Sequence, residues 1–137
     1  MKTGTLQLLV AAPALLLAFL ACSSFTTTPT SITNGGGEAG GKKFKYTAVM
    51  DAAGISGQFT WDGKTFDVIC VYKPDSADGT ASIYLSDGLA VNVVDGKKSD
   101  QISVPFLYTA EDCHAPATSL TDIVMQPVAN GHLTVHQ

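Results

Sequence analysis

The stretch KFKYTAVMDAAGISGQFTWDGKTFDVICVY, residues 43–72, decides the fold. On both sides of its Asp62-Gly63 pair, apolar and polar side chains alternate; the apolar positions include Phe44, Tyr46, Ala48, Ile55, Phe59, Trp61, Phe66, Val68 and Cys70. A period of two is typical of strands that bury one face. Asp-Gly tolerates the positive φ angles of a type I′ turn, so the stretch predicts a β-hairpin.

Similar short segments continue to the C-terminus. Further turn pairs separate them: Asp78-Gly79, Asp87-Gly88, Asp95-Gly96 and Asn130-Gly131. Pro105 cannot donate to a ladder, so it should mark an edge or a bulge. No segment after residue 42 has a sustained helical period with caps. We therefore expect an all-β domain over residues 43–137, a small antiparallel sandwich or barrel of about seven to eight strands.

The N-terminal residues have the pattern of an export signal. Lys2 precedes an apolar run from Leu8 to Ala21. The junction Phe19-Leu20-Ala21-Cys22 resembles the lipobox of bacterial lipoproteins, in which the cysteine is lipidated and becomes the mature N-terminus. The resemblance implies a signal peptide over residues 1–21, a lipid such as palmitate at Cys22, and a place at a membrane of the bacterial cell envelope.

Two alternatives remain open for this segment. Cleavage after Ser23 would satisfy the ordinary small-residue rule and release a secreted protein. A retained membrane span is the weaker alternative, because the run contains Pro13 and lacks a basic flank on its C-terminal side. Residues 23–42 are rich in Ser, Thr and Gly, so we expect residues 22–42 to be the lipidated N-terminus and a flexible linker.

The chain has three cysteines, an odd number for an exported protein. If Cys22 carries the lipid, Cys70 and Cys113 are left as one disulfide-bonded pair. Two free buried thiols are the alternative. No Cys-x-x-Cys pair indicates a redox or zinc site.

Charge excludes some partners. The net charge is −4 and all eight basic residues are Lys, so a nucleic-acid partner is not expected. The densest basic cluster is Lys42, Lys43 and Lys45. It is expected to protect an edge strand from association; contact with an anionic surface is the alternative.

The sequence shows no catalytic constellation, so we expect no enzyme, no cofactor and no metal site. His132 and His136 on one strand would lie about 13 Å apart, too far to share an ion. Two acid pairs could line a calcium loop, Asp75 with Asp78 and Asp95 with Asp100. Neither has the spacing of an EF-hand, and solvated turn acids are the simpler interpretation.

Binding residues are therefore sought on loops. The candidates are Trp61, Asp62 and Lys64 at the hairpin tip, with Glu111 and His114 in the loop that Cys113 would staple. The hypothesis requires Trp61 to be exposed and both loops to lie near one end of the domain. Packing of Trp61 in the core is the alternative.

These observations favour a membrane-tethered extracytoplasmic β-domain with a non-catalytic binding role toward a protein or a glycan. The expected architecture is similar to that of lipid-anchored lysozyme inhibitors, which are small disulfide-linked antiparallel barrels. That similarity implies enzyme inhibition as one form of the binding role. The alternative function is a secreted small enzyme or metal carrier.

Overall fold

The structure is a computed structural model that describes residues 30–74, 79–108, 113–119 and 122–136. Its described residues form one antiparallel sheet of ten strands and one short 3-10 turn, η1. The strands are β1 (Thr30–Ala39), β2 (Lys42–Asp51), β3 (Gly54–Trp61), β4 (Lys64–Tyr72), β5 (Thr80–Leu85), β6 (Leu89–Val94), β7 (Gln101–Ser103), β8 (Phe106–Leu107), β9 (Met125–Pro127) and β10 (Ala129–Val135), and η1 is Ser86–Gly88.

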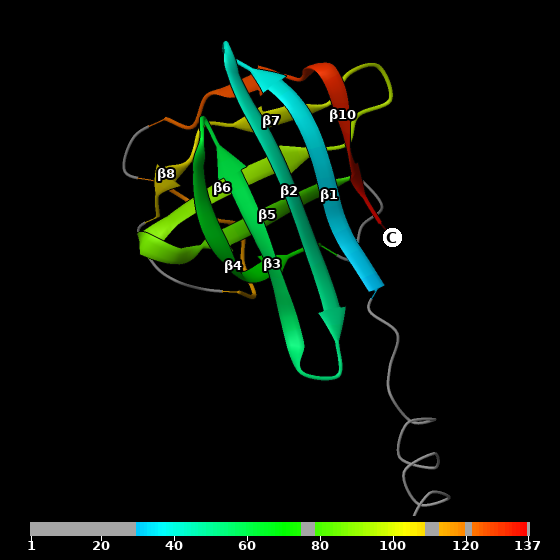
Figure 1. Cartoon of the computed structure of the whole chain (residues 1–137), viewed down its shortest axis with the longest axis vertical. Helices are drawn as coiled ribbons and strands as arrows, with labels where there is room; N and C mark the ends of the chain where they lie inside the picture. The colour runs from blue at the N-terminus through cyan, green and yellow to red at the C-terminus, as the bar shows by residue number, and fades with distance from the viewer. Residues whose placement is uncertain (1–29, 75–78, 109–112, 120–121, 137) are drawn as a thin grey trace, which may run out of the picture.

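The sheet curls into a nearly closed barrel. Its strand order is β10-β1-β2-β3-β4-β5-β6-β7-β9, and β8 also pairs with β6. In Figure 1, β1 to β3 lie in front, and β5 and β6 cross behind them. The expected all-β antiparallel architecture with one disulfide is confirmed, with ten strands in the described residues rather than seven or eight.

The domain begins earlier than the sequence indicates. Residues 30–39, predicted as part of a flexible linker, form β1, which lies between β10 and β2. The linker prediction is wrong for this part, and residues 22–29 lie outside the described residues. Residues 35–37 of β1 are all glycine, so this part of the strand has no side chains to bury. The packing of β1 in the barrel therefore depends on the side chains of the neighbouring strands.

Those neighbours are aromatic. Across the ladder, Gly35 faces Tyr46 and Gly37 faces Phe44. A Cβ at Gly35 would lie only 2.5 Å from the Cβ of Leu133 on β10, so glycine is required for β1 and β10 to approach. Four rings stack inside the barrel as a cluster in which each ring contacts two others: Phe44, Tyr46, Phe59 and Trp61. The missing side chains of β1 thus leave room for large rings from β2.

Of the five predicted turn pairs, two adopt the expected conformation; Asp95 and Gly96 lack positive φ, and Asp78 lies outside the described residues. Asp62 and Asp87 both adopt positive φ, each followed by a glycine with positive φ. Asn130 has a φ of 55°, but it lies within β10, which pairs with β1 and not with β9. Pro105 interrupts the pairing to β6 between β7 and β8, as expected of a bulge.

Two carboxylates from the β6–β7 connection bond to β10, the strand at one end of the sheet; we call this junction the seam of the barrel. Oδ2 of Asp100 accepts the backbone N–H of Leu133 at 2.8 Å, and Oδ2 of Asp95 accepts that of Val135 at 3.1 Å. Both donors lie on β10, on the edge that faces away from β1. The prediction that these acids are merely solvated is therefore wrong, because they satisfy backbone groups that a missing strand would otherwise pair.

Candidate binding site

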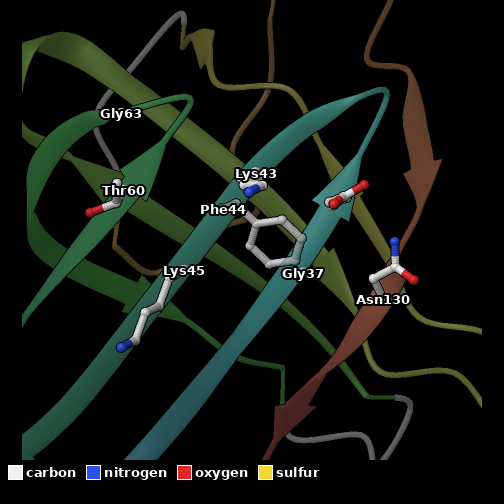
Figure 2. A pocket seen from close by; sticks show the side chains of 8 residues that line it. Gly37, Lys43, Phe44, Lys45, Thr60, Gly63 and Asn130 are labelled. Atoms are coloured by element: carbon white, nitrogen blue, oxygen red, sulfur yellow. The ribbon is translucent and has the colours of Figure 1, made fainter.

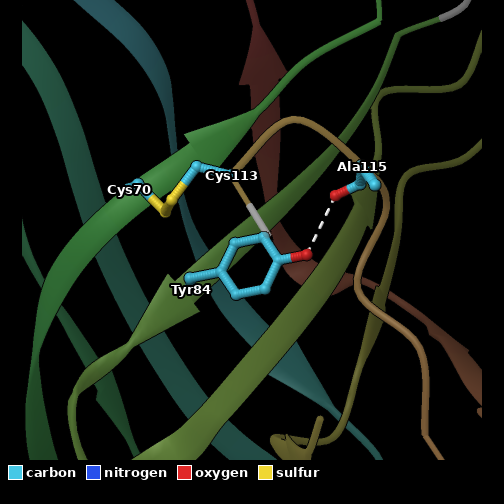
Figure 3. The surroundings of a disulfide bond; sticks show 4 residues. All are labelled: Cys70, Tyr84, Cys113 and Ala115. Carbon is cyan, nitrogen blue, oxygen red and sulfur yellow. Dashed lines mark hydrogen bonds between the residues drawn. A yellow bond between two sulfur atoms is a disulfide. The ribbon is translucent and has the colours of Figure 1, made fainter. Parts of the chain in front are cut away.

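A disulfide ties an irregular segment to the outside of the barrel. Cys70 of β4 is bonded to Cys113, with their Cα atoms 6.0 Å apart, so the predicted pairing is confirmed. Figure 3 shows the Tyr84 ring beside the segment that carries Cys113 and Ala115. We call residues 113–119 the strap. A disulfide of this kind is typical of proteins outside the cytoplasm.

Hydrogen bonds hold the strap along its length. The Tyr84 hydroxyl donates to the carbonyl oxygen of Ala115 at 2.9 Å, as Figure 3 shows. The N–H of Ala117 donates to Oγ of Ser82 at 3.0 Å, and the Ser82 hydroxyl donates to Oδ1 of Asn92 at 2.6 Å. Nδ2 of Asn92 donates to the Ala117 carbonyl oxygen at 3.4 Å, so Ala117, Ser82 and Asn92 form a closed ring of hydrogen bonds.

Apolar packing reinforces these bonds. The strap covers a second, small core on the outer face of the barrel, separate from the barrel interior. Its buried members are Cys70, Tyr84, Ala90 and Ala117, with Tyr72, Phe106, Tyr108 and Cys113 packed against them. Tyr84 is fully buried and meets Tyr108 edge-on, with ring centroids 5.1 Å apart. The strap is thus a fixed wall rather than a loose connection.

Beside this wall lies a pocket of about 400 Å³, which we call the strapped pocket. It is lined by Tyr72, Pro74, Thr80, Ala81, Ser82, Asn92, Val93, Val94, Pro116 and Met125. No lining residue is ionisable at neutral pH, and Ser82 and Asn92 already bond to each other and to the strap. Aromatic, proline and methionine walls around a few fixed polar groups are typical of sites for uncharged ligands.

The hairpin tip does not provide the exposed aromatic anchor that the sequence suggested. Trp61 is buried, only 9% exposed, and its ring stacks with Phe44 and Phe59. The prediction of an exposed Trp61 is wrong, because this barrel needs the ring to fill its interior. Asp62 and Lys64 are exposed, and Asp62 forms an ion pair with Lys42 at 3.3 Å.

The second predicted loop lies elsewhere. His114 is exposed on the strap, and Glu111 lies outside the described residues. Lys64 and Cys70 are six residues apart on β4, which separates the tip from the disulfide by about 20 Å along the strand. The structure therefore does not bring the two predicted loops together.

A second hollow lies near the tip and is the pocket of Figure 2. Its volume is about 390 Å³, and Lys43, Lys45 and Thr60 contribute to one side of it. Asn130 of β10 lies across Gly37, as Figure 2 shows. This hollow combines the charged side chains of Glu38, Lys43 and Lys45 with the buried ring of Phe44. The strapped pocket differs in having uncharged walls and a hydrogen-bonded base.

Two absences concern the described residues, 30–74, 79–108, 113–119 and 122–136. Within them, no three His, Cys, Asp or Glu side chains come close enough to hold a metal ion. In the same residues, no helix is both long and apolar enough to cross a membrane.

Sequence reasoning missed the residues of the strapped pocket. Tyr72, Pro74, Pro116 and Met125 come from three separate segments, and none belongs to a recognisable motif. One signal for this region was present in the sequence, namely Cys113. It predicted that its loop is bonded to the strand of Cys70, but it did not predict which residues the loop covers. Searches for similar proteins bring no further signal: no protein-family model, no curated protein and no solved structure matches this chain.

Proposed function

We propose that this protein is a lipid-anchored envelope β-barrel that binds an uncharged, apolar segment of a protein partner in the strapped pocket, without catalysis. The observation that carries the proposal is the construction of that pocket. One of its walls is fixed before any ligand arrives, by the Cys70–Cys113 disulfide and by the Ser82–Asn92 hydrogen bonds. A preformed wall lowers the ordering cost of binding.

The chemistry of the pocket favours an apolar occupant. Pro74 and Pro116 offer rigid surface, Tyr72 offers a half-buried ring, and Met125 adapts to irregular shapes. The buried Ser82 is already hydrogen-bonded and offers a ligand little new pairing. A protein segment with aliphatic or proline side chains fits this lining better than a glycan, which needs many polar contacts. Inhibition of a partner enzyme is one outcome of such binding.

The lipid anchor at Cys22 rests on the lipobox-like junction. The disulfide supports the same compartment, since disulfides persist outside the cytoplasm. Lipidation of Cys22 would also explain the odd cysteine count. Intact mass of membrane-extracted protein tests the anchor: a species that begins at Cys22 with a lipid is expected, and a soluble product that begins at Ser24 would contradict it.

Site-specific photo-crosslinking tests the pocket. Full-length protein carrying benzoylphenylalanine at Tyr72 would be produced in its own cells and irradiated. Thr65, exposed on β4 away from the pocket, is the matched control position. We expect one defined protein adduct from position 72 that is absent from position 65. It should also be lost when Val94→Lys places a charged side chain in the pocket.

Equal adducts from both positions, or an adduct at position 72 that survives Val94→Lys in a folded protein, would contradict the proposed pocket. The melting temperature of the Val94→Lys variant, compared with that of the parent, establishes that loss of the adduct is not loss of the fold.

A further inference from the structure

The place where the chain joins the barrel decides which end of the domain faces the membrane. β1 begins at Thr30, which pairs with Met50 near the end of β2. The β2–β3 turn follows at once, since Asp51 pairs with Gly54. Figure 1 shows the start of β1 and the β2–β3 turn at the same end of the molecule. We call this the tether end.

The connection to the anchor is short. Only seven residues separate Cys22 from Thr30. Any chain of that length spans at most about 28 Å when fully extended, and about 16 Å on average when flexible. The strand β1, with ten residues, is itself about 30 Å long. The far end of β1 therefore cannot be turned toward the bilayer unless the connection is stretched to its limit.

The two ends differ in chemistry. At the β2–β3 turn, Met50 is 51% exposed, Ala52 and Ala53 are exposed, and no lysine lies between Val49 and Gly57. Lys73 lies near the start of β1, where its ammonium group donates to the carbonyl oxygen of His136. The carboxylate of Asp51 accepts the N–H of Ala53 at 2.8 Å, which ties the acid into the turn. The four lysines Lys42, Lys43, Lys45 and Lys64 lie on β2 and β4 toward the other end.

We propose that the β2–β3 turn, with Met50, Ala52 and Ala53, is the surface that rests on the lipid bilayer, so that the lysine-rich end points away from the membrane. The inference rests on the proposed lipid anchor at Cys22. A small apolar turn held close to the bilayer by the anchor can bury apolar surface at the lipid interface, which adds a weak contact to that of the acyl chains. The partner is the lipid surface itself rather than a protein.

Depth-dependent quenching tests this orientation on full-length lipidated protein in liposomes. A Cys introduced by Ala52→Cys would carry an environment-sensitive fluorophore; the matched control is Thr65→Cys, near the lysine-rich end. The label is unique because Cys70 and Cys113 are bonded to each other and Cys22 carries the lipid. Nitroxide lipids should quench the label at position 52 several-fold more than the label at position 65.

A charge variant sharpens the test. Met50→Asp should reduce the quenching at position 52, whereas Leu107→Asp, at another exposed apolar side chain, should leave it unchanged. If the protein floats with the liposomes but both positions are quenched equally, or position 65 more, the orientation is overturned and the anchor stands. If the protein does not float with the liposomes, the anchor fails and the orientation fails with it.

Discussion

Asp100 and Leu133 are joined across the seam of the barrel by a 2.8 Å hydrogen bond from the Leu133 backbone N–H to the Asp100 carboxylate. The other carboxylate oxygen of Asp100 accepts the N–H of Gly96 at 3.2 Å. The Asp100 side chain therefore holds its own loop in place and also accepts a hydrogen bond from a backbone N–H group on the outer edge of β10. An edge strand whose N–H groups are covered in this way offers less to a neighbouring chain.

Removal of this carboxylate should loosen the seam. Asp100→Ala is expected to lower the free energy of unfolding by about 2 kcal/mol, because hydrogen bonds to charged acceptors contribute about 1.5–3 kcal/mol. Urea unfolding measures the change. Asp67→Ala is the control, since Asp67 is exposed on β4 and should change stability by less than about 0.5 kcal/mol. Equal effects of the two changes would contradict the role of Asp100.

The disulfide should stabilise the domain and preserve the strapped pocket. Cys70 and Cys113 are 43 residues apart, and the chain-entropy model gives such a bridge about 4 kcal/mol. Urea unfolding with and without a reductant should show a loss of this order. Non-reducing peptide mapping should yield one linked peptide containing both cysteines. Unchanged stability after verified reduction would show that the hydrogen bonds hold the strap unaided.

Tyr46 gives the protein an alkaline limit. Burial raises the pKa of its phenol. The hydrogen bond to Thr33 lowers the pKa by less than burial raises it, and the charges of Asp100 and Asp95 add smaller increases. Above pH ~10 the unfolded chain loses this proton while the folded protein keeps it. Stability from this group is therefore complete below pH ~10 and falls above it by about 1.4 kcal/mol per pH unit.

Unfolding midpoints at pH 9 and pH 11 measure this slope. Tyr46→Phe is the matched variant, because it keeps the ring inside the barrel and removes the titrating group. Thr33 retains its hydrogen bond to the Thr134 carbonyl at 2.8 Å in that variant. The variant should be less sensitive than the parent to the rise in pH; identical slopes would show that other groups set the alkaline limit.

Two adjacent glycines should differ in their tolerance of alanine. A Cβ at Gly35 would meet the Cβ of Leu133 at 2.5 Å, so Gly35→Ala should force β1 and β10 apart and cost about 1–3 kcal/mol. A Cβ at Gly36 would find its nearest neighbour, the Phe44 carbonyl oxygen, at 3.5 Å, an ordinary contact. Gly36→Ala should be close to neutral. Melting temperatures of the two variants measure this difference, and equal melting temperatures would contradict the close approach of β1 and β10 at Gly35.

The sequence was sufficient where local chemistry and tertiary packing agree. Around Asp62-Gly63 the turn residues, the period of two and the aromatic positions all favour one hairpin, and β3 and β4 form it. The pairing of Cys70 with Cys113 followed from cysteine arithmetic and the compartment. In both cases a few residues suffice to specify the contact.

It was insufficient where glycine takes part in packing. Gly35 and Gly37 look like linker residues, and their role appears only when the rings of Tyr46 and Phe44 are placed opposite them. Asn130 similarly has the conformation of a turn residue, but β1 continues alongside it and makes it part of a strand. The strapped pocket was also beyond prediction, because its walls meet only through tertiary structure.

The pairing of β1 with β10 has a consequence for folding kinetics. Thr33 and Thr134, which it brings into hydrogen-bond contact, are 101 residues apart. Pairings of such long sequence separation form slowly. Because β10 follows the other nine described strands in the sequence, the edge of β1 that it covers stays unpaired until all of them have been synthesised. During that interval this edge of β1 is open to pairing with another copy of the chain, so the time to closure of the barrel sets how long the newly made chain is exposed to aggregation.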